Sequence, residues 1–154
     1  MTAPYQRQSV EGVLANHEKR VGILEAVTAI KPINVKMCGD DELLVAATPD
    51  FIFGVIDEDL DGAILIAANA YVTAVSAANI VIRILNVTAT PTIMTSTDIT
   101  IGAGNTTSLS GAGSVTGVID PLYAVVALED LVLIAIQSPG AGDAFGLGVS
   151  LVFI

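Results

Sequence analysis

The sequence predicts a mainly β fold, an antiparallel β-sandwich preceded by a short N-terminal helix. After residue 31, runs of β-branched residues alternate with Gly, Asn, Asp and Pro turns, a pattern typical of strands. Before it, from Ser9 to Ile30, apolar residues recur at helical spacing, and Ser9 is placed as an N-cap. We therefore expect an N-terminal arm with a helix over 1–31 and a β-domain over 32–154.

The composition indicates one hydrophobic core and more apolar residues than that core needs. The chain has 154 residues, enough for one domain with a short appendage. Its hydrophobic fraction is 53%, against about 45–50% in ordinary soluble domains, and 14% of its residues are charged, against about 25%. Soluble monomers rarely leave large apolar patches in water. We therefore expect copies of the chain, or a larger assembly, to cover part of this surface.

The charge balance argues against nucleic acid as a partner. The formal net charge is −10 and there are only six Lys and Arg, whereas binding phosphates requires clustered cations. No run reaches the roughly 18 apolar residues of a membrane span, since the strongest, Leu131–Ile136, has the length of a strand. The first ten residues show no apolar signal-peptide region, and the one cysteine, Cys38, cannot form an intrachain disulfide. The expected setting is a cytoplasm, with neither membrane nor nucleic acid as partner.

The predicted helix carries a heptad seam that indicates self-association. The seam residues are spaced four and three apart, and they are Val10, Leu14, His17, Val21 and Leu24. Arg20 and Glu25 flank the seam at positions where parallel helices form ion pairs between chains. A helix of this length is marginal alone, so the seam predicts an oligomerisation or anchoring site. The alternative is an amphipathic helix that packs on its own β-domain, which needs the same apolar stripe.

Eight or nine strands are expected in the β-domain. The candidate ranges are 33–38, 42–47, 51–56, 63–75, 79–87, 92–101, 115–119, 131–137 and 145–153. Many strands of this length without helices between them indicate a sandwich or barrel, and the jelly roll is the eight-stranded sandwich of this kind. We therefore predict a jelly-roll-like sandwich, with the small and polar segment 102–117 as a long surface loop.

The last predicted strand has a period of two. Five large residues are expected on one face, and they are Phe145, Leu147, Val149, Leu151 and Phe153. Gly146 and Gly148 fall on the other face, where another backbone or subunit could approach closely. This strand is expected to be central to the sandwich or to line the axis where subunits meet.

One acidic segment resembles part of a calcium-binding loop. Asp57, Asp59 and Asp61, followed by Gly62, match the front of an EF-hand loop. The match ends there, because Ala68 stands where the bidentate glutamate should be and the flanking residues have strand patterns. We therefore expect a tight acidic turn that keeps the loop soluble, and no metal site.

Residues for catalysis are sparse. His17 is the only histidine and lies in the predicted helix, distant in sequence from the serines, so no nucleophile with a base is evident. Cys38 has no clustered metal-ligand partners. Sugar-cleaving and sugar-binding sites are usually lined with aromatic rings, and the chain has no Trp, three Tyr and four Phe. The sequence predicts a non-enzymatic protein without a cofactor, in which His17 sets the register of the seam or is a partly solvated helix residue.

The region Phe51–Ile154 resembles a group of structural proteins of tailed bacteriophages. The similar features are an acidic-Leu-Asp-Gly turn, a Ser-Thr-x-Ile-Thr-Ile strand, an acidic strand start and a closing Gly-Leu-x-Val-x-Leu-x-Phe strand, found at Ile56–Gly62, Ser96–Ile101, Leu128–Leu131 and Gly146–Phe153. The segment Asn16–Arg20 is similar to helices that open small phage virion proteins. The resemblance implies a trimeric β-sandwich displayed on a capsid or tail, with the N-terminal segment joining or anchoring the subunits.

We therefore expect a capsid decoration or cement protein that binds the outer capsid surface as a homotrimer and stabilises the shell. Its partners would be copies of itself and the major capsid protein. Its location would be the outer surface of a virion assembled in the host cytoplasm. The alternative is a head- or tail-fibre module that recognises a host-cell receptor, with 102–117 as its contact surface.

Overall fold

The computed structural model describes residues 30–46, 50–88 and 90–154 of the chain. In this part every pair of strands is antiparallel and no helix occurs, so the prediction of an antiparallel, all-β domain is confirmed. The strands belong to one compact unit, Lys31–Ile154. The helix expected before this unit lies outside the described residues.

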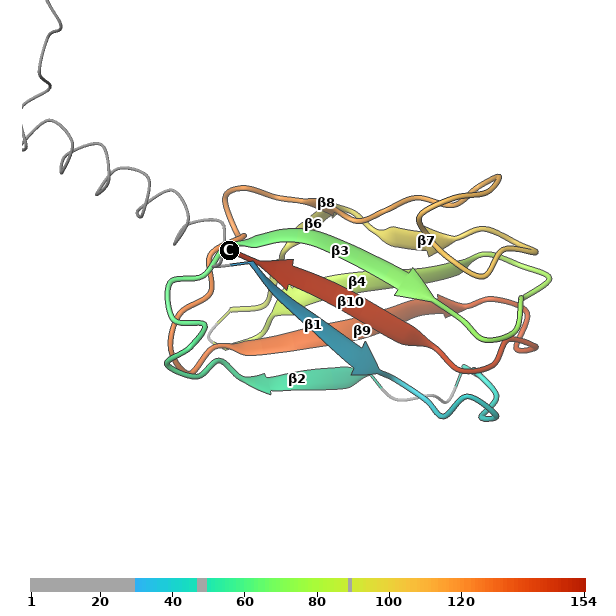
Figure 1. Cartoon of the computed structure of the whole chain (residues 1–154), viewed down its shortest axis with the longest axis horizontal. Coiled ribbons are helices and arrows are strands. Elements are labelled where there is room, and N and C mark those ends of the chain that lie inside the picture. Colours follow the sequence, from blue (N-terminus) through green and yellow to red (C-terminus); the bar gives the residue numbers. More distant parts are fainter. Residues whose placement is uncertain (1–29, 47–49, 89) are drawn as a thin grey trace, which may run out of the picture. The chain divides into compact units, whose positions relative to one another are not determined.

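The first sheet has the C-terminal strand in its centre (Figure 1), in the order β1-β10-β3. The bounds of its strands are β1 Lys31–Lys36, β3 Leu65–Tyr71 and β10 Gly148–Phe153. Leu151 of β10 lies opposite Ile33 on one side and opposite Ala68 on the other. The register shifts by a bulge between Val152 and Phe153, which leaves Ile66 as the extra residue of β3.

The second sheet is built around β4 and β9, and its order is β2-β9-β4-β5, with β7 also paired to β4. The bounds of its strands are β2 Phe51–Val55, β4 Ile80–Asn86, β5 Thr92–Ile93, β7 Ile99–Ile101 and β9 Leu131–Pro139. A separate two-stranded pair joins β6, Thr95–Thr97, to β8, Val118–Ile119. The register of β4 on β9 slips once, between Val81 and Ile82.

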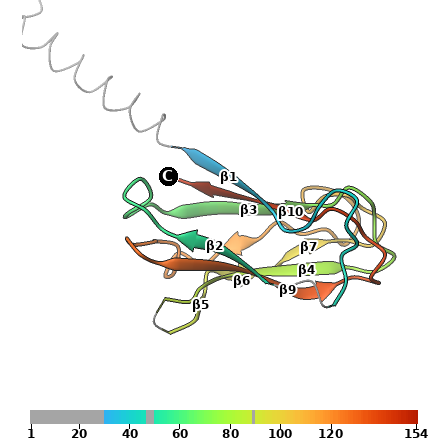
Figure 2. The ribbon, with the colours of Figure 1, turned by 90° about the horizontal axis from the view of Figure 1, so that it is seen from below.

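The core lies between the two sheets, which Figure 2 shows as two layers with β1, β3 and β10 above β4 and β9. Strand alternation explains how one cluster forms, because every second residue of a strand points to the same face. The inward residues of β4 and β10 are fully buried in this cluster, and they are Ile80, Ile82, Ile84, Val149, Leu151 and Phe153. Burying each such side chain contributes about 1.5–3 kcal/mol relative to leaving it in water.

The prediction for the C-terminal strand is confirmed at four of its five large residues. Leu147, Val149, Leu151 and Phe153 are buried, and β10 is the central strand of its sheet. Phe145 is half-buried and precedes the strand. On the opposite face the group that approaches Gly148 is the ring of Tyr71, from the neighbouring strand β3.

The predicted long loop is confirmed, and it covers the outer edge of β3. The described residues 102–117 form no named strand, although single bridges tie them to β3 and β7. Ser108 is buried, and its N–H donates to the Ala70 carbonyl while its Oγ accepts from the Ala70 N–H, both at 2.9 Å. The Gly117 N–H donates to the Ala68 carbonyl at 3.1 Å. The Ala68 carbonyl and both backbone groups of Ala70 on this edge of β3 are therefore paired within the chain.

Two of the expected strands are corrected by the structure. The range 92–101 is not one strand, because its middle part leaves β4 to pair with β8 as β6, and β7 then returns to β4. Residues 42–46 form no named strand, since Gly39 and Glu42 close a turn there and Leu43 makes only a single bridge to Phe145. Local composition identifies the β-rich stretches but does not show which strand each one pairs with.

Candidate interaction surfaces

The predicted oligomerisation residues fall outside the described part of the chain. They are Val10, Leu14, His17, Arg20, Val21, Leu24 and Glu25, all within residues 1–29. The heptad seam therefore stays a prediction.

Three exposed apolar residues lie side by side across one end of the first sheet. Ile64 and Ile154 exchange two backbone hydrogen bonds, of 2.9 and 3.0 Å, and Ile64 forms a bridge with Val125 on its other side. Ile64 is 42% exposed, Ile154 47% and Val125 55%. We refer to these three residues as the apolar row.

The apolar row faces away from the core. The residues next to it in the chain point inward, since Leu65, Phe153, Ala124 and Val126 are all buried. The adjacent row on the same face contains Pro32, Val152 and Ala67, which lie opposite one another in the register. None of these six outward residues carries a charge. The end of the sheet therefore presents a neutral, apolar face to solvent.

This neutral face belongs to a strongly acidic unit. Lys31–Ile154 contains thirteen Asp and Glu but only three Lys and Arg, so it carries the whole net charge of −10. All three cations are engaged: Lys36 pairs with Asp40 at 2.8 Å, Arg83 with Asp98 at 2.7 Å, and the Lys31 ammonium donates to the Asp59 carbonyl. The net charge makes two copies of the unit repel each other. The apolar row is a region where they can approach without placing like charges together.

The acidic segment from Asp57 to Gly62 forms a tight turn, as expected. Gly62 has a φ of +75°, the left-handed conformation that glycine adopts without strain. Asp57 Oδ1 accepts from the Asp59 N–H at 3.1 Å, and Asp61 Oδ1 accepts from the Leu128 N–H at 2.9 Å. The carboxylates of Asp57 and Asp61 therefore cap the backbone of two loops. Within the described ranges, no group of three or more His, Cys, Asp and Glu side chains is close enough to hold a metal ion.

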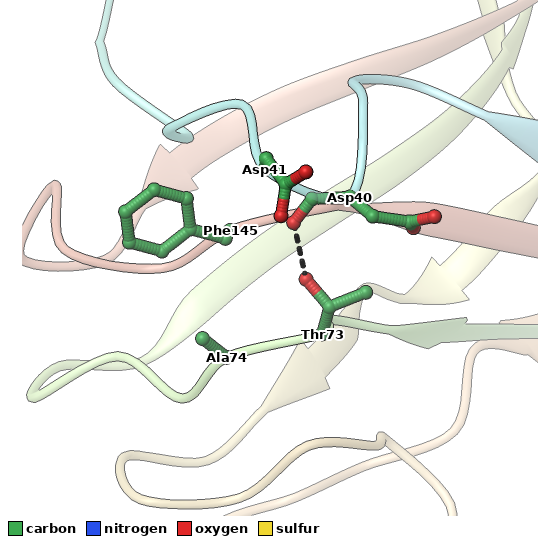
Figure 3. A pocket seen from close by; sticks show the side chains of 5 residues that line it. All are labelled: Asp40, Asp41, Thr73, Ala74 and Phe145. Carbon is green, nitrogen blue, oxygen red and sulfur yellow. Dashed lines mark hydrogen bonds between the residues drawn. The ribbon is translucent and has the colours of Figure 1, made fainter.

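A hollow of about 400 Å³ lies at the end of the unit that contains the loop after β1. Figure 3 shows its lining, which is Asp40, Asp41, Thr73, Ala74 and Phe145. The Thr73 hydroxyl donates to the Asp40 carbonyl at 2.8 Å, across the junction of two loops. The Asp40 carboxylate is paired with Lys36, whose pKa it raises by hydrogen bonding. The polar groups of the hollow thus serve largely to join these loops.

Arg83, which interrupts an apolar strand in the sequence, has a structural partner. Its guanidinium binds both oxygens of the Asp98 carboxylate, at 2.9 and 2.7 Å. This hydrogen-bonded pairing raises the pKa of Arg83. Both side chains are partly buried, and the ion pair links β4 to the residue just before β7. The sequence shows Arg83 as an anomaly, but only the fold brings Asp98 beside it.

Comparison with known proteins finds neither a family model nor a curated protein that matches this chain. Among the described residues there is no helix long and apolar enough to cross a membrane.

Proposed function

We propose that this chain is a non-enzymatic structural protein of a virion, a capsid decoration or cement protein. It binds the outer capsid surface as a homotrimer, contacts the major capsid protein and stabilises the shell. The apolar row on an otherwise acidic unit is the observation that carries the self-association. The assignment to a phage virion rests on the resemblance of Phe51–Ile154 to phage structural proteins.

We further infer that the sandwich has a jelly-roll topology, and its strand pairing supports this. The pairs are nested along the chain: β1 with β10, β2 with β9, β3 with Gly117 just before β8, and β4 with β7. These pairs alternate between the two sheets. A long antiparallel ribbon rolled upon itself produces this order, which is the arrangement of the eight-stranded double-sheet fold.

The apolar row can provide only part of the energy of association. Full burial of one large apolar side chain contributes about 1.5–3 kcal/mol, so three half-exposed ones add about 3 kcal/mol per copy. Association costs about 4–15 kcal/mol in lost translational and rotational freedom. A second contact is therefore needed, and the heptad seam from Val10 to Leu24 is the one that the sequence offers.

The mass of the full chain in solution tests this proposal. We expect light scattering to give about three times the monomer mass of 15.8 kDa at micromolar concentration. The double variant Ile64→Asp/Val125→Asp should shift the mass toward the monomer, because it places acids where copies meet. Leu109→Asp is the matched control, since Leu109 is an exposed apolar residue on the 102–117 loop. A monomeric wild-type chain would contradict the proposal.

Copy number separates the two virion roles. A decoration protein is expected at tens to hundreds of copies per particle and should bind isolated capsids, whereas a tail tip has few copies. The alternative is a head- or tail-fibre module that recognises a host-cell receptor, with the loop at 102–117 as its contact surface. Binding to host cells without binding to empty capsids would establish that alternative in place of the decoration role.

A further inference from the structure

The neutral face at the end of the first sheet has two sides that differ in charge. One side is the edge strand β1, which contributes Pro32, and the other is the segment 118–131, which contributes Val125. β1 contains two lysines and no acid, whereas 118–131 contains three acids and no cation. The middle of the face lies over β10 and β3, which are neighbours in the sheet (Figure 1).

Lys31 leaves the β1 side with a positive charge that no carboxylate balances. The other two cations of the β-unit are each paired with a carboxylate. The Lys31 ammonium donates instead to a backbone carbonyl, that of Asp59, and it forms no ion pair among the described residues. Lys31 is exposed and precedes Pro32 in the chain. An acidic unit therefore carries its one unpaired cation beside the neutral face.

These charges favour one orientation between two copies. A contact between two β1 sides would bring two Lys31 charges together, and a contact between two 118–131 sides would bring acids together. A β1 side placed against a 118–131 side instead joins opposite charges around an apolar surface. Because this contact joins two different sides, it can repeat around a closed ring, whereas a contact between like sides ends at two copies.

We propose that the β1 side of one copy docks on the 118–131 side of the next, and that three such contacts close the homotrimer. This inference rests on the proposed function, which supplies the number of copies. Pro32 of one copy then lies against Val125 of the next. Val152 and Ile154, in the middle of the face, turn toward the threefold axis.

Disulfide cross-linking of the full chain tests this docking. The variant Pro32→Cys/Val125→Cys changes two exposed residues. Within one chain these positions are three strand spacings apart, about 14 Å, whereas a disulfide spans no more than about 7 Å between Cα atoms. A bond between the two positions therefore joins two copies. We expect oxidation at micromolar concentration to convert most of the chain into a covalent trimer on non-reducing gels, and reduction to restore the monomer.

The controls use the same gels. Each single variant should remain unlinked, and so should Pro32→Cys/Gln137→Cys, because Gln137 is an exposed residue of β9 in the second sheet. The native Cys38 is buried, so the wild-type chain should also remain unlinked.

Two outcomes would overturn the docking. Cross-linked dimers from either single variant would mean that like sides meet. A trimeric mass in light scattering without bonds between positions 32 and 125 would mean that another segment or partner covers the face, and it would leave the proposed function standing. A monomeric mass would contradict both the docking and the proposed function.

Discussion

Gly148→Ala should destabilise the β-unit through Tyr71. A Cβ built on Gly148 overlaps the hydroxyl end of the Tyr71 ring: Cζ is the nearest atom, and Cε1 and Oη both lie at 2.5 Å, whereas real Cβ atoms essentially never come within 3.0 Å of a non-neighbouring heavy atom. The ring must therefore leave its place over β10. Tyr71 is 41% exposed, so it can swing into solvent without disturbing the core.

The magnitude follows from two opposed effects. Displacing a packed side chain to make room for a methyl group costs about 1–3 kcal/mol. Replacing glycine by alanine within a strand returns about 0.5–1 kcal/mol, because the unfolded chain loses freedom. Together the two effects give a net loss in the free energy of unfolding of between about 0 and 2.5 kcal/mol for Gly148→Ala. In a Tyr71→Ala background only the second effect remains, so the same substitution should be neutral or stabilising by about 0.5–1 kcal/mol.

Urea unfolding of the four chains in this double-mutant cycle provides the measurement, with the midpoints compared at unchanged slope. The cycle should be run at two protein concentrations. If Gly148→Ala costs the same with and without Tyr71, the reasoning from Tyr71 is wrong. If its cost appears only as a loss of oligomer at low concentration, the group that approaches Gly148 belongs to another copy.

Three further substitutions test other parts of the fold. Leu151→Ala should lower the free energy of unfolding, measured in urea, by about 2–5 kcal/mol. The upper end is expected because Ala68, opposite Leu151 on β3, is too small to fill the cavity. A loss below about 0.5 kcal/mol would place β10 at the periphery of the fold. Glu129 has a φ of 69°, a left-handed conformation that glycine adopts with less strain than glutamate. Glu129→Gly should therefore increase the free energy of unfolding by about 0.5–1 kcal/mol and raise the melting temperature. An unchanged or lower melting temperature would contradict this. Burial alone would raise the pKa of Asp130, but hydrogen bonds from the Ala127 N–H and from two side chains lower it overall below 3.8. A carboxyl with a lowered pKa stabilises the fold fully above its unfolded pKa and loses that effect as the pH falls through the folded value. The stability advantage of wild type over Asp130→Ala should therefore be constant above about pH 5 and shrink below 3.8, and a difference independent of pH would refute the assignment.

Much of the sandwich could be predicted from local patterns. The alternation in β10 predicts its buried face, because every second residue points to the same side and the large apolar residues all fall on one side. The small, polar composition of 102–117 identified a loop. The division of 92–101 could not be foreseen, because the residues of β6 have the same strand propensity whether they pair with β4 or with β8. That choice depends on Ile119, more than twenty residues later.

The surface features depend even more on distant pairing. Ile64 looks like part of a continuous buried run in the sequence Ala63–Ala68, and only its bonds to Ile154 and its bridge to Val125 reveal an exposed row. The N-terminal seam remains a prediction from spacing alone.

The two edges of the first sheet limit strand pairing between neighbouring copies of the chain. The 102–117 loop occupies the hydrogen-bonding edge of β3, and Pro32 on β1 has no N–H to offer a further strand. The β3 edge is therefore covered, and the β1 edge lacks one of the donors that a strand from a neighbouring molecule would pair with. Where many copies stand close together, their contacts remain between side-chain faces and do not extend into a continuous sheet. For the proposed trimer, such contacts favour a closed set of subunits over an open-ended sheet.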